Sequence, residues 1–117
     1  MNIVTGIREV IGEPLSAVSF VQDYVEFHFD GKIIRSLTCP ILLTADKTYK
    51  FPEKGSRDGL CSLIGRAVTE LVVEDRSRIK IAFVGEASLI IPLADSERTG
   101  PEAAHFVTGD NQPIEVW

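Results

Sequence analysis

The residues best suited to chemistry in this chain are two histidines, two cysteines and a few carboxylates. His28, His105, Cys39 and Cys61 are the histidines and cysteines of the 117-residue sequence. A zinc site would need all four to converge, and they lack the close-paired spacing of structural zinc sites. The sequence therefore predicts no metal site and no cofactor. We expect both cysteines to be reduced and mostly buried, with a disulfide between them as the open alternative.

Acid–base catalysis needs two carboxylates held in different environments within one cleft. Glu26 and Asp30 share the outer face of one predicted strand, two pleats apart, and are expected to be solvated there. No serine lies in a nucleophile-elbow pattern, and no glycine-rich phosphate loop is present. We therefore expect no catalytic site. A deep cleft that gathers these carboxylates with His28 or a cysteine would reverse this expectation.

One predicted strand places an aromatic residue, an acid and a histidine on the same face. Residues 24–30 alternate strictly, so their apolar set faces inward and their polar set faces outward. Tyr24, Glu26 and His28 belong to the outward set and are our candidate binding residues. Such a mixture suits a protein interface, and an ordinary exposed strand face is the competing interpretation.

Two helix-and-strand units are expected to position these residues. In the first, over residues 5–40, a short helix begins at Thr5 and ends at Gly12 in a left-handed C-terminal cap. Three strands follow, at 15–22, 24–30 and 32–38. The Asp30-Gly31 pair predicts a tight hairpin turn between the last two. A connecting hairpin and a surface loop occupy residues 41–57.

The second unit, residues 58–92, follows the same layout. Its helix has Ser56 or Asp58 as N-cap and ends at Gly65. Strands are predicted at 66–74, 78–84 and 87–92. The tail, 93–117, is expected to form an acidic loop and then a closing hairpin of 105–108 and 114–117 across Gly109-Asp110-Asn111. His105 would have a structural role there, and Trp117 would anchor the tail to the core.

The two units suggest an internal repeat. A shift of 53 residues places Gly6 on Gly59, Gly12 on Gly65 and Leu15 on Val68; a shift of 54 then places Phe27 on Ile81 and Gly31 on Gly85. Glycines mark backbone positions rather than hydrophobicity, which favours duplication. The alternative is that any two such units share apolar periodicity. If the repeat is real, the units should pack about a pseudo-twofold axis.

Length and charge narrow the class of protein. A chain of 117 residues predicts one domain, and 44% apolar with 25% charged residues is typical of globular proteins. The net charge is −5, and no basic stripe is present, so we expect no nucleic-acid partner and no membrane partner. The polar start of the chain lacks the pattern of a signal peptide, which favours a cytoplasmic location.

Several short motifs carry a resemblance to a known group. The segment Leu63-Ile-Gly-Arg-Ala-Val, the alternating Ile79-x-Ile-x-Phe and the stretch from Val21 to Gly31 are followed by an acidic segment and a terminal Val116-Trp117. This pattern resembles a family of small bacterial proteins of unknown function, over most of residues 11–117. The resemblance implies no activity, cofactor or catalytic residue. The segment 101–106 departs from the aromatic-rich acidic end expected of such proteins.

Together these patterns predict an α+β fold, mostly antiparallel β, with two short helix–three-strand units and one or two added hairpins. The function that we expect is a non-enzymatic binding or protein-interaction module, of the immunity type in its narrower form. Its partner would be another protein or a second copy in a homodimer. The alternative is a small-ligand-binding domain with a cavity in a curved sheet.

Overall fold

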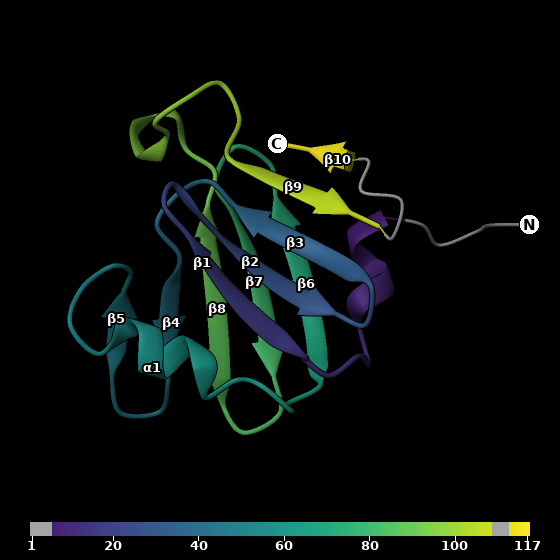
Figure 1. Cartoon of the computed structure of the whole chain (residues 1–117), viewed down its shortest axis with the longest axis vertical. Coiled ribbons are helices and arrows are strands. Elements are labelled where there is room, and N and C mark those ends of the chain that lie inside the picture. Colours follow the sequence, from purple (N-terminus) through teal and green to yellow (C-terminus); the bar gives the residue numbers. More distant parts are fainter. Residues whose placement is uncertain (1–5, 109–112) are drawn as a thin grey trace, which may run out of the picture.

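The computed structural model describes residues 6–108 and 113–117, which form two five-stranded antiparallel sheets packed face to face (Figure 1). The first sheet has the order β1-β2-β3-β9-β10, and the second has the order β5-β4-β8-β7-β6. The strands of the first sheet are β1 (Ala17–Val21), β2 (Tyr24–Phe29), β3 (Lys32–Ser36), β9 (Ala104–Val107) and β10 (Pro113–Val116). Those of the second are β4 (Ile41–Leu43), β5 (Thr48–Lys50), β6 (Val68–Glu74), β7 (Arg78–Phe83) and β8 (Ala87–Pro92). The prediction of a mostly antiparallel α+β fold is therefore confirmed.

The described residues also form three short helices. The 3-10 helix η1 (Gly6–Val10) precedes β1, the α-helix α1 (Ser56–Cys61) lies between β5 and β6, and the 3-10 helix η2 (Asp95–Glu97) lies between β8 and β9. The first helix predicted from the sequence is η1, and its expected cap, Thr5, lies outside the described residues. The predicted caps of the second helix are wrong. Gly55 precedes α1 in the left-handed conformation, at φ 87°, and Ser56 is already the first helical residue. The turn into α1 therefore depends on a glycine rather than on a capping side chain.

The space between the sheets is filled by the alternate residues of both. Phe27, Phe29 and Ile81 are fully buried, and Phe83 is 3% exposed, as their alternation predicts. Residues of η1 and the α1 region join the same core cluster, and Trp117 packs against it. The expectation that Trp117 anchors the end of the chain is thus confirmed. Of the closing hairpin, β9 and β10 pair as predicted, and the residues of its turn lie outside the described part of the chain.

The segment that follows η1 and the segment that follows α1 lie side by side and exchange equivalent backbone hydrogen bonds. The amide of Gly12 donates to the carbonyl of Val68, and the amide of Gly65 donates to the carbonyl of Leu15, both at 2.8 Å. The donors Gly12 and Gly65 are 53 residues apart, and so are the acceptors Leu15 and Val68, so each segment donates to the other at equivalent positions. The glycines have nearly equal φ angles, 91° and 93°. The registers of the strands that follow are also equivalent. Val18 pairs with Phe27 between β1 and β2, and the corresponding Leu71 pairs with Ile81 between β6 and β7.

Each half of the chain completes the sheet of the other half. Strand β3 leads into the β4–β5 hairpin, which pairs with β8 of the second sheet. Strand β8 leads into β9, which pairs with β3 of the first sheet, and β10 pairs with β9 at the edge. Each sheet is therefore a three-strand meander from one half of the chain extended by two strands from the other half.

Candidate functional site

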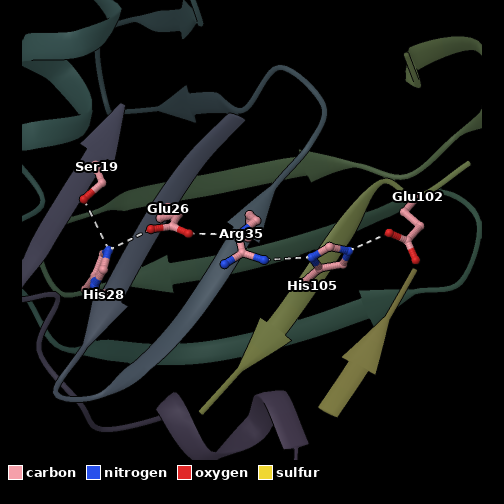
Figure 2. Close-up of polar contacts among 6 residues, drawn as sticks. All are labelled: Ser19, Glu26, His28, Arg35, Glu102 and His105. Carbon is pink, nitrogen blue, oxygen red and sulfur yellow. Dashed lines mark hydrogen bonds and ion pairs between the residues drawn. The ribbon is translucent and has the colours of Figure 1, made fainter. Parts of the chain in front are cut away.

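The outer face of the first sheet carries a row of polar side chains that crosses four strands (Figure 2). Ser19 on β1 lies opposite Glu26 on β2, Glu26 lies opposite Arg35 on β3, and Arg35 lies opposite His105 on β9. Directly opposed residues of antiparallel strands have Cβ atoms about 4.5–5.5 Å apart, so their side chains can interact. We call Ser19, Glu26, His28, Arg35, Glu102 and His105 the polar row.

The centre of the polar row is an ion pair between β2 and β3. Arg35 Nε donates to Glu26 Oε2 at 2.9 Å, and the two side chains are 19% and 14% exposed. The Arg35 guanidinium also lies 5.3 Å from the centroid of the Tyr24 ring. A guanidinium at that distance is attracted by the ring's negative face. Both partners of the ion pair are therefore largely removed from water and held in fixed positions.

His28 contacts two side chains through a single ring nitrogen. Its Nε2 lies 3.3 Å from Ser19 Oγ and 3.3 Å from Glu26 Oε1. An ionised carboxylate accepts hydrogen bonds but cannot donate them, so a favourable contact with Glu26 requires a proton on Nε2. In a Ser-His-Asp triad the serine and the carboxylate contact opposite ring nitrogens. The arrangement around His28 therefore differs from a catalytic triad although it contains the same residue types.

His105 extends the row from Arg35 to Glu102. Arg35 Nη1 lies 3.1 Å from His105 Nδ1, and His105 Nε2 lies 2.8 Å from Glu102 Oε1. Because a guanidinium only donates, Nδ1 must be the acceptor and therefore carries no proton. The neutral ring with its proton on Nε2 satisfies both contacts, since Nε2–H then donates to Glu102. Protonation of Nδ1 would place two donors against each other.

The structure corrects the expectation about one carboxylate and confirms that about another. The sequence predicts Glu26 in solvent, but it is the more buried partner of the central ion pair, because Arg35 and His28 both contact its carboxylate. Asp30 is exposed as predicted, but it lies in the turn after β2, in a left-handed conformation at φ 48°. Of the predicted binding residues, Tyr24, Glu26 and His28 all lie on the outer face as expected.

Arg35 and His105 are members of the row that the sequence arguments missed. Arg35 could have been found, because a two-residue turn at Asp30-Gly31 places it opposite Glu26. His105 was assigned a structural role, and its pairing with Arg35 joins strands that lie 70 residues apart in sequence. No local pattern indicates that contact.

No family model, no curated protein and no solved structure matches this chain. Its function is therefore inferred from the residues of the site themselves.

The cysteines and histidines do not form one cluster. Cys39 and Cys61 are free and exposed, so the expectation that they are mostly buried is wrong. Cys39 follows the end of β3 and precedes Pro40, while Cys61 ends α1 beside the inward-facing Leu60. In the described part of the chain, no three side chains of His, Cys, Asp and Glu gather in a group that could hold a metal ion. Within residues 6–108 and 113–117, no helix is long and apolar enough to cross a membrane.

Among the described residues, cavities open at the margins of the fold, and two of them are well formed. One, of about 580 Å³, lies between the β4–β5 hairpin and α1 and is lined by Lys47, Lys54 and Asp58 among others. The second, of about 480 Å³, lies beside the turn between β1 and β2 and includes Tyr24 in its lining. Tyr24 therefore borders both this cavity and Arg35 of the polar row.

Proposed function

We propose that this protein is a binding module that docks a partner protein on the outer face of its first sheet. The observation that carries this proposal is the half-buried polar row. Exposed ion pairs contribute about 0–1 kcal/mol to stability, and the desolvation of more buried pairs offsets much of their attraction. Stability alone is therefore a weak reason for a chain of six polar and ionisable side chains across a sheet.

The composition and the order of this face suit a protein partner. Tyrosine and arginine are enriched among the residues that dominate binding energies at interfaces. Arg35 is held by Glu26, by the Tyr24 ring and by His105. A side chain that is already ordered loses less conformational entropy when a partner covers it. The outer face thus presents a pre-ordered arginine and tyrosine to a partner.

The charge of the chain favours a basic partner. The net charge is −5, and oppositely charged surfaces accelerate association and select against partners of like charge. In its narrower form, the proposal is that the protein neutralises a basic enzyme, as immunity-type proteins do. A cytoplasmic location and membership in a family of small bacterial proteins stay predictions from the sequence.

The test compares variants of the two sheets. Tagged wild-type protein, Arg35→Ala, Tyr24→Ala and Lys80→Ala are used as baits in native lysate, with mass spectrometry of the retained proteins. Lys80 is the matched control because it lies opposite Val72 and Ile90 on the second sheet, in the register that Glu26 has on the first. We expect the wild type and Lys80→Ala to retain a basic partner in stoichiometric amount. Arg35→Ala and Tyr24→Ala should not retain it. A partner retained equally by all four, or no partner at all, contradicts the proposal.

A homodimer is the form of this proposal in which the partner is a second copy. Sedimentation equilibrium of the same four proteins separates it from binding of another protein. A dimer that dissociates in Arg35→Ala and Tyr24→Ala, but not in Lys80→Ala, would assign the face to self-association. A monomer at all concentrations would leave the other protein as the partner.

Small-ligand binding is the second candidate, and the cavity beside Tyr24 favours it. Its volume of about 480 Å³ lies within the range of about 300–1,000 Å³ that ligand sites occupy. This cavity lies at the edge of the sandwich, whereas the prediction from the sequence placed a cavity within a curved sheet. A thermal-shift screen with small organic compounds would support this candidate if Tm rises and the rise is lost in Tyr24→Ala.

We also propose that the two units descend from one duplicated unit. Three correspondences support this origin: the reciprocal hydrogen bonds of Gly12 and Gly65, the equivalent strand registers, and the mutual exchange of hairpins. Profile comparison of the two halves across homologous sequences would test it. Similarity of the halves no greater than that of unrelated sandwich proteins would contradict it.

A further inference from the structure

The cavity beside Tyr24 is assembled from segments that are far apart in the sequence. The turn between β1 and β2 contributes one side, the segment after β3 another, and Phe51-Pro52 a third. Glu97 of η2 and Thr99 complete the lining. The cavity is therefore a product of the tertiary structure and lies at the end of the face that carries the polar row.

The charged residues of this cavity have one sign. Asp23 and Glu97 are the charged members among the described residues that line it. Neither carboxylate forms an ion pair or a hydrogen bond with another residue in the described part of the chain. The cavity at the opposite hairpin differs, because Lys47 and Lys54 outnumber Asp58 there. A cation is thus favoured beside Tyr24 and not at the other cavity.

The rest of the lining is largely apolar. Tyr24, Phe51, Leu37 and Pro52 form walls against which a hydrocarbon stem can pack. The Phe51 ring is held in place, since it stacks on Phe20 with ring centroids 5.8 Å apart and has the Arg57 guanidinium 5.0 Å from its centroid. Lysine and arginine side chains combine an apolar stem with a cationic end, and they bury the stem while the charge meets a carboxylate.

We propose that this cavity receives a lysine or arginine side chain of the partner protein. This inference rests on the proposed function and names the part of the partner that enters the surface. The stem lies against the aromatic and aliphatic walls, and the cationic end meets Asp23 and Glu97. Because Tyr24 belongs to both the cavity and the Arg35 contact, the inserted residue lies next to the polar row.

The first experiment uses a side-chain probe rather than the unidentified partner. N-acetyl-lysine methylamide is titrated into ¹⁵N-labelled protein, with the norleucine analogue as a control of equal stem and no charge. We expect amide shifts confined to 22–25, 37–39, 51 and 97–99. Binding of the norleucine analogue should be at least about tenfold weaker. Equal shifts from both probes, or shifts centred elsewhere, overturn the inference. Binding of free 1,4-diaminobutane more than about tenfold tighter than the lysine probe also overturns it, because the cavity would then be a small-molecule site.

The second experiment removes the charges with matched variants. Asp23→Asn combined with Glu97→Gln should weaken binding of the lysine probe by about tenfold or more. Asp75→Asn is the control, since Asp75 is an exposed acid of the turn between β6 and β7 and does not line the cavity. It should change binding by less than about twofold. An unchanged affinity in the double variant, with its fold verified by the ¹⁵N spectrum, overturns the inference.

The two proposals fail in different ways. If the lysine probe does not bind but the partner is still lost from Arg35→Ala, the docking face stands and the cavity has no role. If the probe binds as expected but no partner depends on Arg35, the cavity is a site for basic side chains and the docking face is wrong.

Discussion

The two sheets have matching registers but carry different residues on their outer faces. The central row of the first sheet, strand by strand, is Ser19, Glu26, Arg35, His105 and Val116. The corresponding row of the second sheet is Val72, Lys80, Ile90, Ile41 and Lys50. Three of these five residues are aliphatic, while the first row has three ionisable side chains in contact with one another. The same backbone arrangement therefore supports two different surfaces.

The second row shows how this sheet stabilises an outer face without a polar network. Ile90 is 6% exposed although it lies outside the core cluster, because its neighbours on the flanking strands cover it. Aliphatic contacts and lysine stems provide that cover at little desolvation cost. A sequence could thus have covered the first sheet in the same way. The ionisable residues on the first face therefore favour a role in recognition rather than in stability.

The largest expected effects concern the inner faces, where the sheets should respond alike. Phe27 and Ile81 occupy corresponding positions, and both are fully buried. We expect Phe27→Ala to lower the free energy of unfolding by about 3–5 kcal/mol and Ile81→Ala by about 2–5 kcal/mol, because each leaves a cavity in the shared core. Urea unfolding monitored by circular dichroism measures both. A loss below about 1 kcal/mol in either variant would show that the sheets do not share one core.

An intermediate effect should separate the two outer faces. Arg35→Ala leaves Glu26 largely buried without its ion-pair partner, and we expect a loss of about 1–3 kcal/mol in the free energy of unfolding. Lys80→Ala on the second face should change it by less than about 0.5 kcal/mol. If urea unfolding shows equal losses of free energy for Arg35→Ala and Lys80→Ala, the two outer faces do not differ in the way proposed. The double variant Glu26→Gln and Arg35→Ala should recover part of the loss, because no charge is then left unpaired.

The smallest effect concerns the proton on His105. Its contacts with Arg35 and Glu102 predict the Nε2–H form of the neutral ring, which long-range ¹H–¹⁵N correlation spectra identify directly. Arg35→Ala should release this preference and produce a mixture of the two neutral forms. Glu102→Gln should change the free energy of unfolding by less than about 0.5 kcal/mol, since Glu102 is half exposed. An Nδ1–H ring in the wild type would be incompatible with the polar row.

Local patterns were sufficient to predict part of the site. Strict alternation placed Tyr24, Glu26 and His28 on one face, and the Asp30-Gly31 turn determined which residue of β3 opposes Glu26. Long-range pairing was not accessible in this way. Strand β9 pairs with β3 only because the chain crosses from the second sheet to the first after β8. The contact of His105 with Arg35 therefore depends on the order of the strands in both sheets.

The errors about exposure have a common physical origin. Alternation tells which side of a sheet a residue faces, but not how far its neighbours cover it. Glu26 faces outward, yet its side chain is only 14% exposed, because Arg35 on β3 and His28 on its own strand contact its carboxylate. For Cys61 the error is the opposite one, because the residue was predicted to be buried and is exposed. Cysteines are often buried, but this one ends the short helix α1 on its solvent side.

The exchange of hairpins bears on how the molecule could be divided. A chain cut in the loop between β5 and α1 would yield two pieces, each with three strands of one sheet and two of the other. In the first piece the β4–β5 hairpin lacks β8, and in the second the β9–β10 hairpin lacks β3. A mixture of the two pieces supplies both missing neighbours. The protein is thus a natural candidate for a split reporter whose signal depends on reassembly.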